Sequence, residues 1–253
     1  MYFGKPSTVN RELLYNISKK RVLKGTLPRE LCFYSPKEVY EALTSSNGRV
    51  KKWLSFISEN YLPPPEKKIL LLYPCSAVKP YHLSRSYKVL YATLDTLSQE
   101  LRKKIHVVTV SEPFGLVPEE YYEKWTEWYD CPGLFEWWCR KNGVEYDEAI
   151  VSKSIEILAS YIARYLERTR NHYTRRIAFI RTYTSSVKPS ESTHRKMIEL
   201  ASSKSGIQIE LHPPKDIVEK IVQLRGRNAW DFYGVAHPFA QEYLASILTE
   251  ARE

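Results

Sequence analysis

Short apolar runs alternate with longer amphipathic stretches along most of this chain of 253 residues. The clearest run, residues 68–73, is almost entirely apolar, which is typical of a strand buried on both faces of a parallel sheet. The same pattern predicts three more strands, at residues 105–110, 176–180 and 207–211. We therefore expect a mainly parallel, four-stranded sheet.

Helices are predicted in the stretches between and after these strands. In residues 150–168, an apolar face is formed by Val151, Ile155, Leu158, Ile162 and Tyr165. Further helices are expected at residues 87–103, 189–203, 213–224 and 239–251, and a less regular one in the aromatic stretch 119–143. Strands that alternate with helices indicate an α/β domain with three layers, α/β/α, over residues 67–253.

The first 66 residues show helical spacing only, without a strand pattern. One helix is expected within residues 7–20, and a second begins at Pro36 with Ser35 as its N-cap. Helical spacing continues from Val50 to Ile57 and ends at three consecutive prolines, residues 63–65. Residues 1–66 are therefore predicted to be a helical extension of the α/β domain.

The charge of the chain favours a polyanionic partner. There are 38 Lys and Arg against 29 Asp and Glu, which gives a net charge of +9. Nineteen tyrosines and six tryptophans offer flat rings on which unpaired bases can stack. The alternative stays open that these rings fill the core and that the lysines keep the protein in solution.

The remaining composition excludes several classes of protein. The four cysteines are scattered and form no CxxC pair, so neither a disulfide scaffold nor a structural zinc site is expected. No apolar run approaches the ~20 residues that span a bilayer. The start of the chain has no secretory signal pattern, so we expect a cytoplasmic protein without membrane contact.

The loop after the first predicted strand is rich in reactive side chains. Ligands of open α/β sheets bind beyond the carboxyl ends of the strands. Within residues 74–87 the chain places a thiol, hydroxyls and basic groups, at Cys75, Ser76, Lys79, Tyr81, His82, Ser84, Arg85 and Ser86. One serine is expected to cap the following helix, but one cap does not require so many polar groups.

Two further loops follow strands. After residues 105–110, Gly115 stands between two prolines, which indicates a tight turn, and Glu119 lies in an apparent helix start. After residues 176–180, Arg181 and its neighbouring hydroxyls are suited to phosphate, with a solvated loop as the equal alternative. The chain has no GxGxxG, no P-loop and no HExxH, and its six histidines are widely separated, so no cofactor and no metal is assigned.

These loops resemble the archaeosine synthase family. Pro74-Cys75-Ser76, Lys79-Pro80-Tyr81 and Ser84-x-Ser86 are similar to its PCSxxKPYxxSxSH motif. The segment from Gly115 to Glu119, followed by Tyr129-Asp130, is similar to its GLVPxEL…YD stretch. The resemblance covers roughly residues 50–166.

The resemblance implies a uracil-DNA-glycosylase-like α/β/α fold and a role in tRNA modification. In that family the amino group of free lysine is joined to the nitrile of 7-cyano-7-deazaguanine at position 15 of archaeal tRNA. A radical partner enzyme then completes the formamidine. Because no barrel catalytic domain or tRNA-binding module is evident, we expect a stand-alone subunit or relative that works with such a partner.

The resemblance also suggests roles for single residues. A Cys75 thiolate can add to a nitrile, assisted by Lys79, while Glu119 or Asp130 binds the amino acid or acts as a base. Contacts with the base or the amino acid are expected from Ser76, Pro80, Tyr81, Ser84, Ser86, Gly115 and Tyr129. Contacts with nucleic acid are expected from Lys51, Lys52, Arg85 and Arg181. A small buried cysteine and ordinary capping or surface acids are the competing interpretations.

One position departs from the family motif. The family's histidine after SxS is Tyr87 here, which removes a proton carrier, and His82 is a possible substitute. This departure motivates a second hypothesis, a non-catalytic RNA- or DNA-binding module of the same fold. A third hypothesis, a base-excising glycosylase, rests on fold analogy alone.

Overall fold

The sheet has five strands, one more than predicted. The structure, a computed structural model, describes residues 10–183 and 192–250. The strands run in the order β3-β2-β1-β4-β5, and only β3 is antiparallel to its neighbour. Their bounds are Ile69–Pro74 (β1), Ile105–Ser111 (β2), Gly115–Pro118 (β3), Arg175–Phe179 (β4) and Glu210–His212 (β5).

The prediction of four strands was wrong at β3. Gly115 adopts φ +67 and completes a tight turn, as predicted, but the chain then pairs back onto β2. Four residues ending in proline are too short to show a strand pattern in the sequence. The four predicted strands are all present, and the sheet is mainly parallel as expected.

The register of the sheet brings two loops to the same edge. β1 is central, with Leu71 opposite Val107 on one side and Ile177 on the other. Its residues 70–72 are fully buried because helices cover both faces. Pro74 pairs with Val110, so the loops that leave β1 and β2 start side by side.

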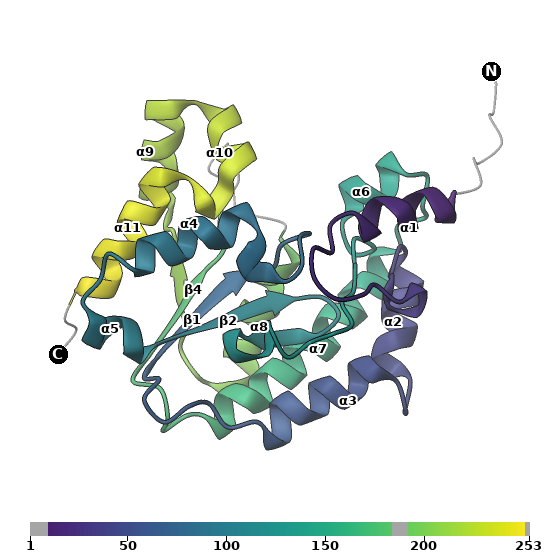
Figure 1. The fold of residues 1–253 in the computed structure, drawn as a ribbon, viewed down its shortest axis with the longest axis horizontal. Coiled ribbons are helices and arrows are strands. Elements are labelled where there is room, and N and C mark those ends of the chain that lie inside the picture. The colour runs from purple at the N-terminus through teal and green to yellow at the C-terminus, as the bar shows by residue number, and fades with distance from the viewer. Residues whose placement is uncertain (1–9, 184–191, 251–253) are drawn as a thin grey trace.

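Helices lie on both faces of this sheet (Figure 1). On one face α4 packs against α11. Helix α11 also contacts α9 and the short 3-10 helix Gly234–Ala236 (η5) that precedes α11. On the other face α7 packs against α8 and α2. The bounds are Pro36–Thr44 (α2), Arg85–Leu94 (α4), Gln99–Lys104 (α5), Glu148–Arg168 (α7), Thr193–Ser205 (α8), Lys215–Arg225 (α9), Arg227–Tyr233 (α10) and Pro238–Thr249 (α11).

Two helix predictions need correction. The single helix expected at residues 87–103 is divided into α4 and α5, because Ser98 caps a new helix after residues 95–97. The stretch 119–143 is helical only at Glu119–Tyr121 (η4) and Glu136–Lys141 (α6). Trp128 and Tyr129 between them are buried on all sides, so tertiary contacts rather than one amphipathic face hold this segment.

The N-terminal extension contains the predicted helices. Asn10 caps Arg11–Lys19 (α1), and Ser35 caps α2 with Pro36 at its first position, as expected. The helix that follows changes from Arg49–Ser55 (α3) into a π-helical turn at Phe56–Asn60 (η2). The shorter η1 spans Arg29–Leu31.

The extension shares the core of the α/β domain. Val39 and Leu54 belong to the same buried cluster as Leu71 and Leu158. Trp53 of α3 donates a hydrogen bond from Nε1 to the carbonyl of Leu116 in β3 (3.0 Å). A boundary at residue 66 therefore stays a prediction. Among the described helices, none is long and apolar enough to cross a membrane.

Candidate active site

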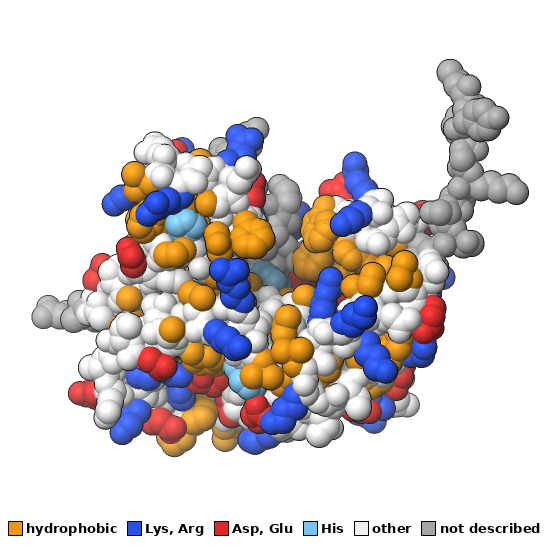
Figure 2. Space-filling model, turned by 45° about the horizontal axis from the view of Figure 1, so that its top comes forward, with side chains coloured by type: hydrophobic (Ala, Val, Ile, Leu, Met, Phe, Trp, Pro, Cys, Tyr) orange, Lys and Arg blue, Asp and Glu red, His pale blue; other side chains and the backbone are white. Residues whose placement is uncertain are grey.

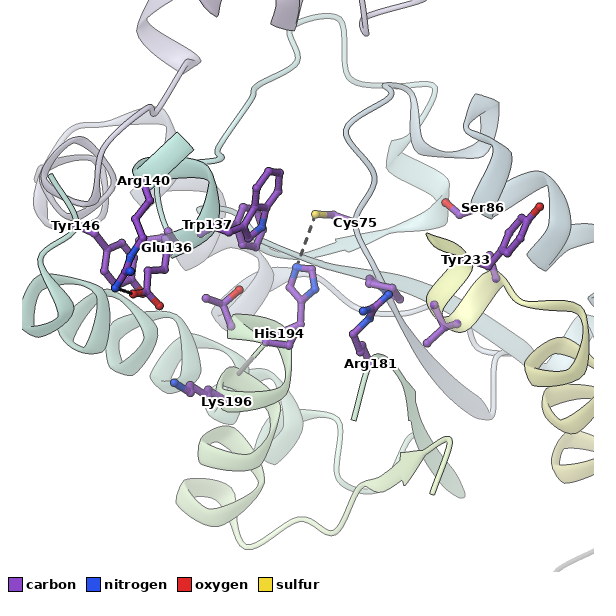
Figure 3. A pocket seen from close by; sticks show the side chains of 18 of the residues that line it. Cys75, Ser86, Glu136, Trp137, Arg140, Tyr146, Arg181, His194, Lys196 and Tyr233 are labelled. Atoms are coloured by element: carbon purple, nitrogen blue, oxygen red, sulfur yellow. Dashed lines mark hydrogen bonds and ion pairs between the residues drawn. The ribbon is translucent and has the colours of Figure 1, made fainter. Parts of the chain in front are cut away.

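Three segments bring a thiol, a carboxylate and an imidazole together at the carboxyl edge of the sheet. Cys75 follows β1, Glu112 lies in the turn between β2 and β3, and His194 lies in the first turn of α8. His194 Nε2 is 3.7 Å from Cys75 Sγ (Figure 3). The same nitrogen is 3.1 Å from Glu112 Oε2. These side chains are separated by up to 119 positions in the chain.

Burial makes the electrostatic coupling within this group strong. Glu112 is 2% exposed and His194 is 8% exposed, whereas Cys75 is half-buried. Burial alone lowers the pKa of His194, but the charges of Glu112 and Cys75 outweigh burial and raise it well above the usual value. Burial likewise raises the pKa of Glu112, and the stronger influence of His194 and Thr193 lowers it. The arrangement favours a protonated imidazole beside an ionised Glu112 carboxylate.

The thiol opens into a cavity of about 1170 Å³. Figure 2 shows this face hollowed between two raised parts, with a histidine in the hollow and Lys and Arg side chains on the adjoining surface. One wall carries Trp137, Arg140 and Tyr146 from around α6, and the other carries Ser86, Arg181 and Tyr233 (Figure 3). Trp137 is 65% exposed although its ring lies beside the cavity, so it is available to a flat ligand.

Tyr87, which occupies the position of the motif histidine, is hydrogen-bonded to the backbone just before Cys75. Its hydroxyl donates to the carbonyl of Pro74 (3.1 Å). The hydroxyl of Thr109 bonds to that of Tyr87, and the hydroxyl of Tyr122 bonds to that of Thr109. If each hydroxyl donates toward Pro74, every donor in this chain has an acceptor. Tyr87 is fully buried and does not line the cavity.

Lys79 is a buried cation next to this loop. It is 3% exposed, and its Nζ lies 5.1 Å from the ring centre of Tyr129 and 5.7 Å from that of Tyr81. The two tyrosine hydroxyls and the hydroxyl of Ser111 lie within hydrogen-bond distance of one another and form one buried network. Lys79, Tyr81 and Tyr129 therefore form a layer behind the cavity wall rather than part of its lining.

The remaining residues of the motif have separate places. Ser84 caps α4 by accepting from the backbone of Tyr87 (3.3 Å), which is the predicted capping role. Ser86 lines the cavity and lies 3.2 Å from the Ser84 hydroxyl. Ser76 accepts from the backbone of Val78, and Pro80 follows a cis peptide bond. Gly115 is buried against Leu54, where an added Cβ would lie 3.0 Å from its Cδ2.

The two acids predicted for catalysis have structural partners outside the cavity lining. Glu119 contacts Lys67 Nζ (2.9 Å), whose amine also donates to the carbonyl of Ile105 at the opposite, amino end of β2. Asp130 accepts from the hydroxyl of Ser18 (2.6 Å) and so fixes α1 to the aromatic segment. Neither acid lines the cavity.

The four predicted nucleic-acid contacts divide between two faces. Arg181 lines the cavity and donates to the carbonyls of Trp230 and Asp231, and Arg85 lies over the ring of Tyr233 at the cavity wall. Lys51 and Lys52 lie on α3, on the side of the sheet away from α4 (Figure 1).

Sequence reasoning missed Glu112 and His194. Glu112 directly follows β2, just as Cys75 directly follows β1, and this matching position was a usable signal. The wide sequence spacing of the histidines does not single out His194, which lies in the first turn of the helix after the third predicted strand. His82, the possible substitute for the motif histidine, contacts Glu123 (2.7 Å), stacks on Tyr122 and does not line the cavity.

Comparison with known proteins gives a consistent set of relatives. Residues 50–205 match the family model described as "Domain of unknown function (DUF5591)". The archaeosine synthase subunit alpha of Thermococcus kodakarensis is 30% identical over 158 residues, which are 60% of this chain and 26% of that protein. The protein of the same name from Thermoplasma acidophilum is 30% identical over 178 residues, 68% of this chain and 31% of that protein.

A third relative and one solved structure complete the comparison. The archaeosine synthase subunit alpha of Methanosarcina acetivorans is 29% identical over 165 residues, 65% of this chain and 22% of that protein. The chain thus spans less than a third of each of these relatives. A crystal structure of a protein of unknown function is 16% identical, covers 79% of this chain and 51% of its own, and has a TM-score of 0.44, too low to carry an argument.

Proposed function

Because the chain belongs to the DUF5591 domain family and to the archaeosine synthase family, we propose that it joins lysine to the nitrile of 7-cyano-7-deazaguanine at position 15 of tRNA. The observation that carries this proposal is the Cys75 thiol, which faces a large cavity with the His194 imidazole 3.7 Å away. A nitrile is an electrophile, and a thiolate paired with an imidazolium is a suitable nucleophile for it.

The proposed reaction has two steps. The Cys75 sulfur bonds to the nitrile carbon, and the nitrile nitrogen takes a proton from His194, which gives a thioimide. The amine of lysine then adds to the same carbon, and the carbon–sulfur bond breaks to leave an amidine and regenerate the thiol. Glu112 holds the charged imidazole in place, whereas the sequence prediction gave Glu119 or Asp130 the role of binding the amino acid or acting as a base.

Cys75 is the best placed thiol among the four. It alone lines the cavity, whereas Cys32, Cys131 and Cys139 are buried. Burial raises the pKa of Cys131 well above its usual value, with further contributions from Glu112 and Asp130 in the same direction. Cys131 is therefore protonated and a poor nucleophile.

The cavity walls suit the two substrates. Trp137 offers a face on which a deazapurine can stack, and Arg181 and Lys196 place positive charge at the lining, which favours RNA. Two carboxylates, Glu148 and the Glu136 that pairs with Arg140, also line the cavity and suit the amino groups of lysine. A cavity above the usual range for small ligands is consistent with a base and an amino acid together.

Fold and partners belong to the same proposal. A mainly parallel sheet with its site at the carboxyl ends of the strands supports a uracil-DNA-glycosylase-like domain. Because the relatives are named subunit alpha, which implies further subunits, we propose that a partner contributes to tRNA binding and that a radical partner completes the formamidine.

The test is the composition of tRNA in cells whose gene for this chain is deleted. We expect the nitrile base to accumulate at position 15, and wild-type protein to restore the lysine adduct and its product, measured by nucleoside mass spectrometry. Cys75→Ser should fail to restore it. Cys32→Ser, which changes a thiol in the N-terminal extension, should succeed.

The non-catalytic alternative has its own signature in the same experiment. If the chain only binds nucleic acid, Cys75→Ser restores the modification as well as wild-type protein does. The loss of the motif histidine at Tyr87 motivates this alternative, but His194 supplies an imidazole to the thiol from another element.

A further inference from the structure

Cys75, Glu112 and His194 also have the chemistry of a metal site. A thiolate, a carboxylate and an imidazole are all ligands of zinc. One ligand atom from each of the three side chains lies within 4.8 Å of the other two. The atoms come from three separate segments of the fold, so their convergence is a tertiary feature and not a consequence of local sequence.

The distances match a shared cation. With usual Zn–S, Zn–N and Zn–O lengths, tetrahedral coordination places sulfur and nitrogen about 3.6 Å apart and nitrogen and oxygen about 3.4 Å apart. The observed separations are 3.7 Å between Cys75 Sγ and His194 Nε2 and 3.1 Å between His194 Nε2 and Glu112 Oε2. The third pair, the sulfur and the carboxylate oxygen, lies within 4.8 Å against about 3.6 Å in a tetrahedral site, so a small approach of these side chains would receive an ion.

The orientation of the imidazole supports the same conclusion. In a triad of nucleophile, histidine and acid, the two outer groups contact different ring nitrogens. Here both the thiol and the carboxylate approach Nε2, although one N–H points well at only one of them. A cation between the three atoms satisfies all of them at once.

The surroundings supply two further requirements of a metal site. The Thr193 hydroxyl donates to Glu112 Oε1, which fixes the carboxylate so that Oε2 faces His194. Cys75 and His194 both line the cavity, so a fourth position is open to water or to a ligand.

We propose that this cluster binds a thiophilic divalent cation, with Zn²⁺ as the reference ion, through Cys75 Sγ, His194 Nε2 and Glu112 Oε2. Binding releases the thiol proton and any proton on Nε2 to solvent, since both atoms then give a lone pair to the cation. The bound thiolate is no longer available to a nitrile. Occupancy by the cation therefore switches off the proposed lysine transfer, and this consequence alone rests on the proposed function.

Cobalt(II) reports on the site directly. Protein freed of metal with a chelator is titrated with Co²⁺, and we expect one equivalent to produce the sulfur-to-cobalt charge-transfer absorption and the intense visible bands of tetrahedral Co²⁺. Cys75→Ser should lose the charge-transfer band, and His194→Ala should bind Co²⁺ much more weakly. Thr193→Val should weaken Co²⁺ binding by at least about tenfold, because it removes the hydrogen bond that orients the Glu112 carboxylate. Cys32→Ser should behave as wild type.

Thermal unfolding separates loss of the site from loss of the fold. A stoichiometric excess of Zn²⁺ should raise the Tm of the wild-type protein and of Cys32→Ser, but not that of Cys75→Ser. Absence of the charge-transfer band in a wild-type protein that unfolds cooperatively would overturn the proposal, and so would a band that persists in Cys75→Ser.

The two proposals fail in distinguishable ways. If Co²⁺ binds as described but tRNA in the deletion cells is unaffected, the metal site stands and the lysine transfer does not. If purified protein transfers lysine and one equivalent of bound Zn²⁺ leaves the rate unchanged, the switch is wrong.

Discussion

The Cys75 thiol owes its setting to residues that no local motif identifies. His194 contacts the sulfur from α8, and Tyr87 holds the backbone beside it through the carbonyl of Pro74. The sequence predicted Cys75 and Ser86 as site residues of one loop and Arg181 as a contact with nucleic acid, and all three line the cavity. The sequence could not predict His194 as a partner of Cys75. The two residues are 119 positions apart, and local residue spacing does not reveal such a long-range contact.

The hydroxyl of Tyr87 should contribute to stability. Tyr87→Phe removes the donor to the Pro74 carbonyl and the partner of the buried Thr109 hydroxyl. An unpaired buried polar group costs about 1–3 kcal/mol, so the free energy of unfolding should fall by that amount. Urea unfolding measures it. Tyr161→Phe, on a partly exposed part of α7, should change it by less than about 0.5 kcal/mol. Equal stability of the two variants would contradict the role of Tyr87.

At the scale of elements, the pattern of hydrophobic positions predicted the long, regular strands and helices. The apolar run of β1 and the amphipathic face of α7 are both present. The pattern missed β3, which is four residues long, and α10, which follows Gly226 directly. It predicted helix in residues 119–143, where rings packed on all sides hold an irregular backbone. Tertiary contacts decide such segments, and they are not visible in periodicity.

A second buried cluster joins three elements at the amino end of β2. Glu120 of η4 lies 3.1 Å from His106 Nε2 and accepts a hydrogen bond from Tyr61 of the segment after η2. Burial raises the pKa of Glu120, but the hydrogen bond and charge of His106, together with Tyr61, lower it below its usual value. The ionised carboxylate is therefore favoured by folding.

This cluster predicts a pH-dependent contribution to stability. A lowered folded-state pKa means that the contribution is complete above the unfolded pKa, about 4.3, and is lost as pH falls through the folded value. Glu120→Gln should lower the free energy of unfolding by about 1 kcal/mol at pH 7. The difference from wild type should shrink below about pH 4. Urea unfolding across this range tests it.

Glu59→Gln is the control for that series. Glu59 forms an exposed pair with Arg164, which should be worth less than about 0.5 kcal/mol at any pH. If the Glu120→Gln difference stayed constant down to pH 3, the lowered pKa would not be its cause.

At the scale of the whole molecule, charge and shape together favour RNA at the cavity. The net charge is +9, and Lys and Arg side chains surround the hollow in the surface (Figure 2). Arg181 and the exposed Trp137 line the cavity, and Arg85 lies over the ring of the cavity-lining Tyr233. Much of the aromatic content is core, as the alternative interpretation held, since rings such as Trp128 and Trp230 are fully buried. The few exposed rings at the cavity are therefore the informative ones.

Affinity for tRNA should depend on the cavity face more than on α3. Trp137→Ala should weaken binding by about 1–3 kcal/mol if a base stacks on the ring. Arg85→Ala should reduce the slope of log affinity against log salt concentration by the amount expected for about one phosphate contact. The pair Lys51→Ala and Lys52→Ala on α3 is the matched control and should have a smaller effect. Fluorescence anisotropy at several salt concentrations measures all three, and a larger loss from the α3 variant would place the RNA on the other face.

The central claim is that the Cys75 sulfur carries out the proposed reaction with His194 as its proton carrier. The most direct measurement is the rate at which purified protein, supplemented with extract from cells that lack it, joins lysine to nitrile-containing tRNA. We predict no transfer by Cys75→Ser and a rate at least about a hundredfold lower for His194→Gln, with Cys32→Ser unchanged. Transfer by Cys75→Ser at the wild-type rate would contradict the account.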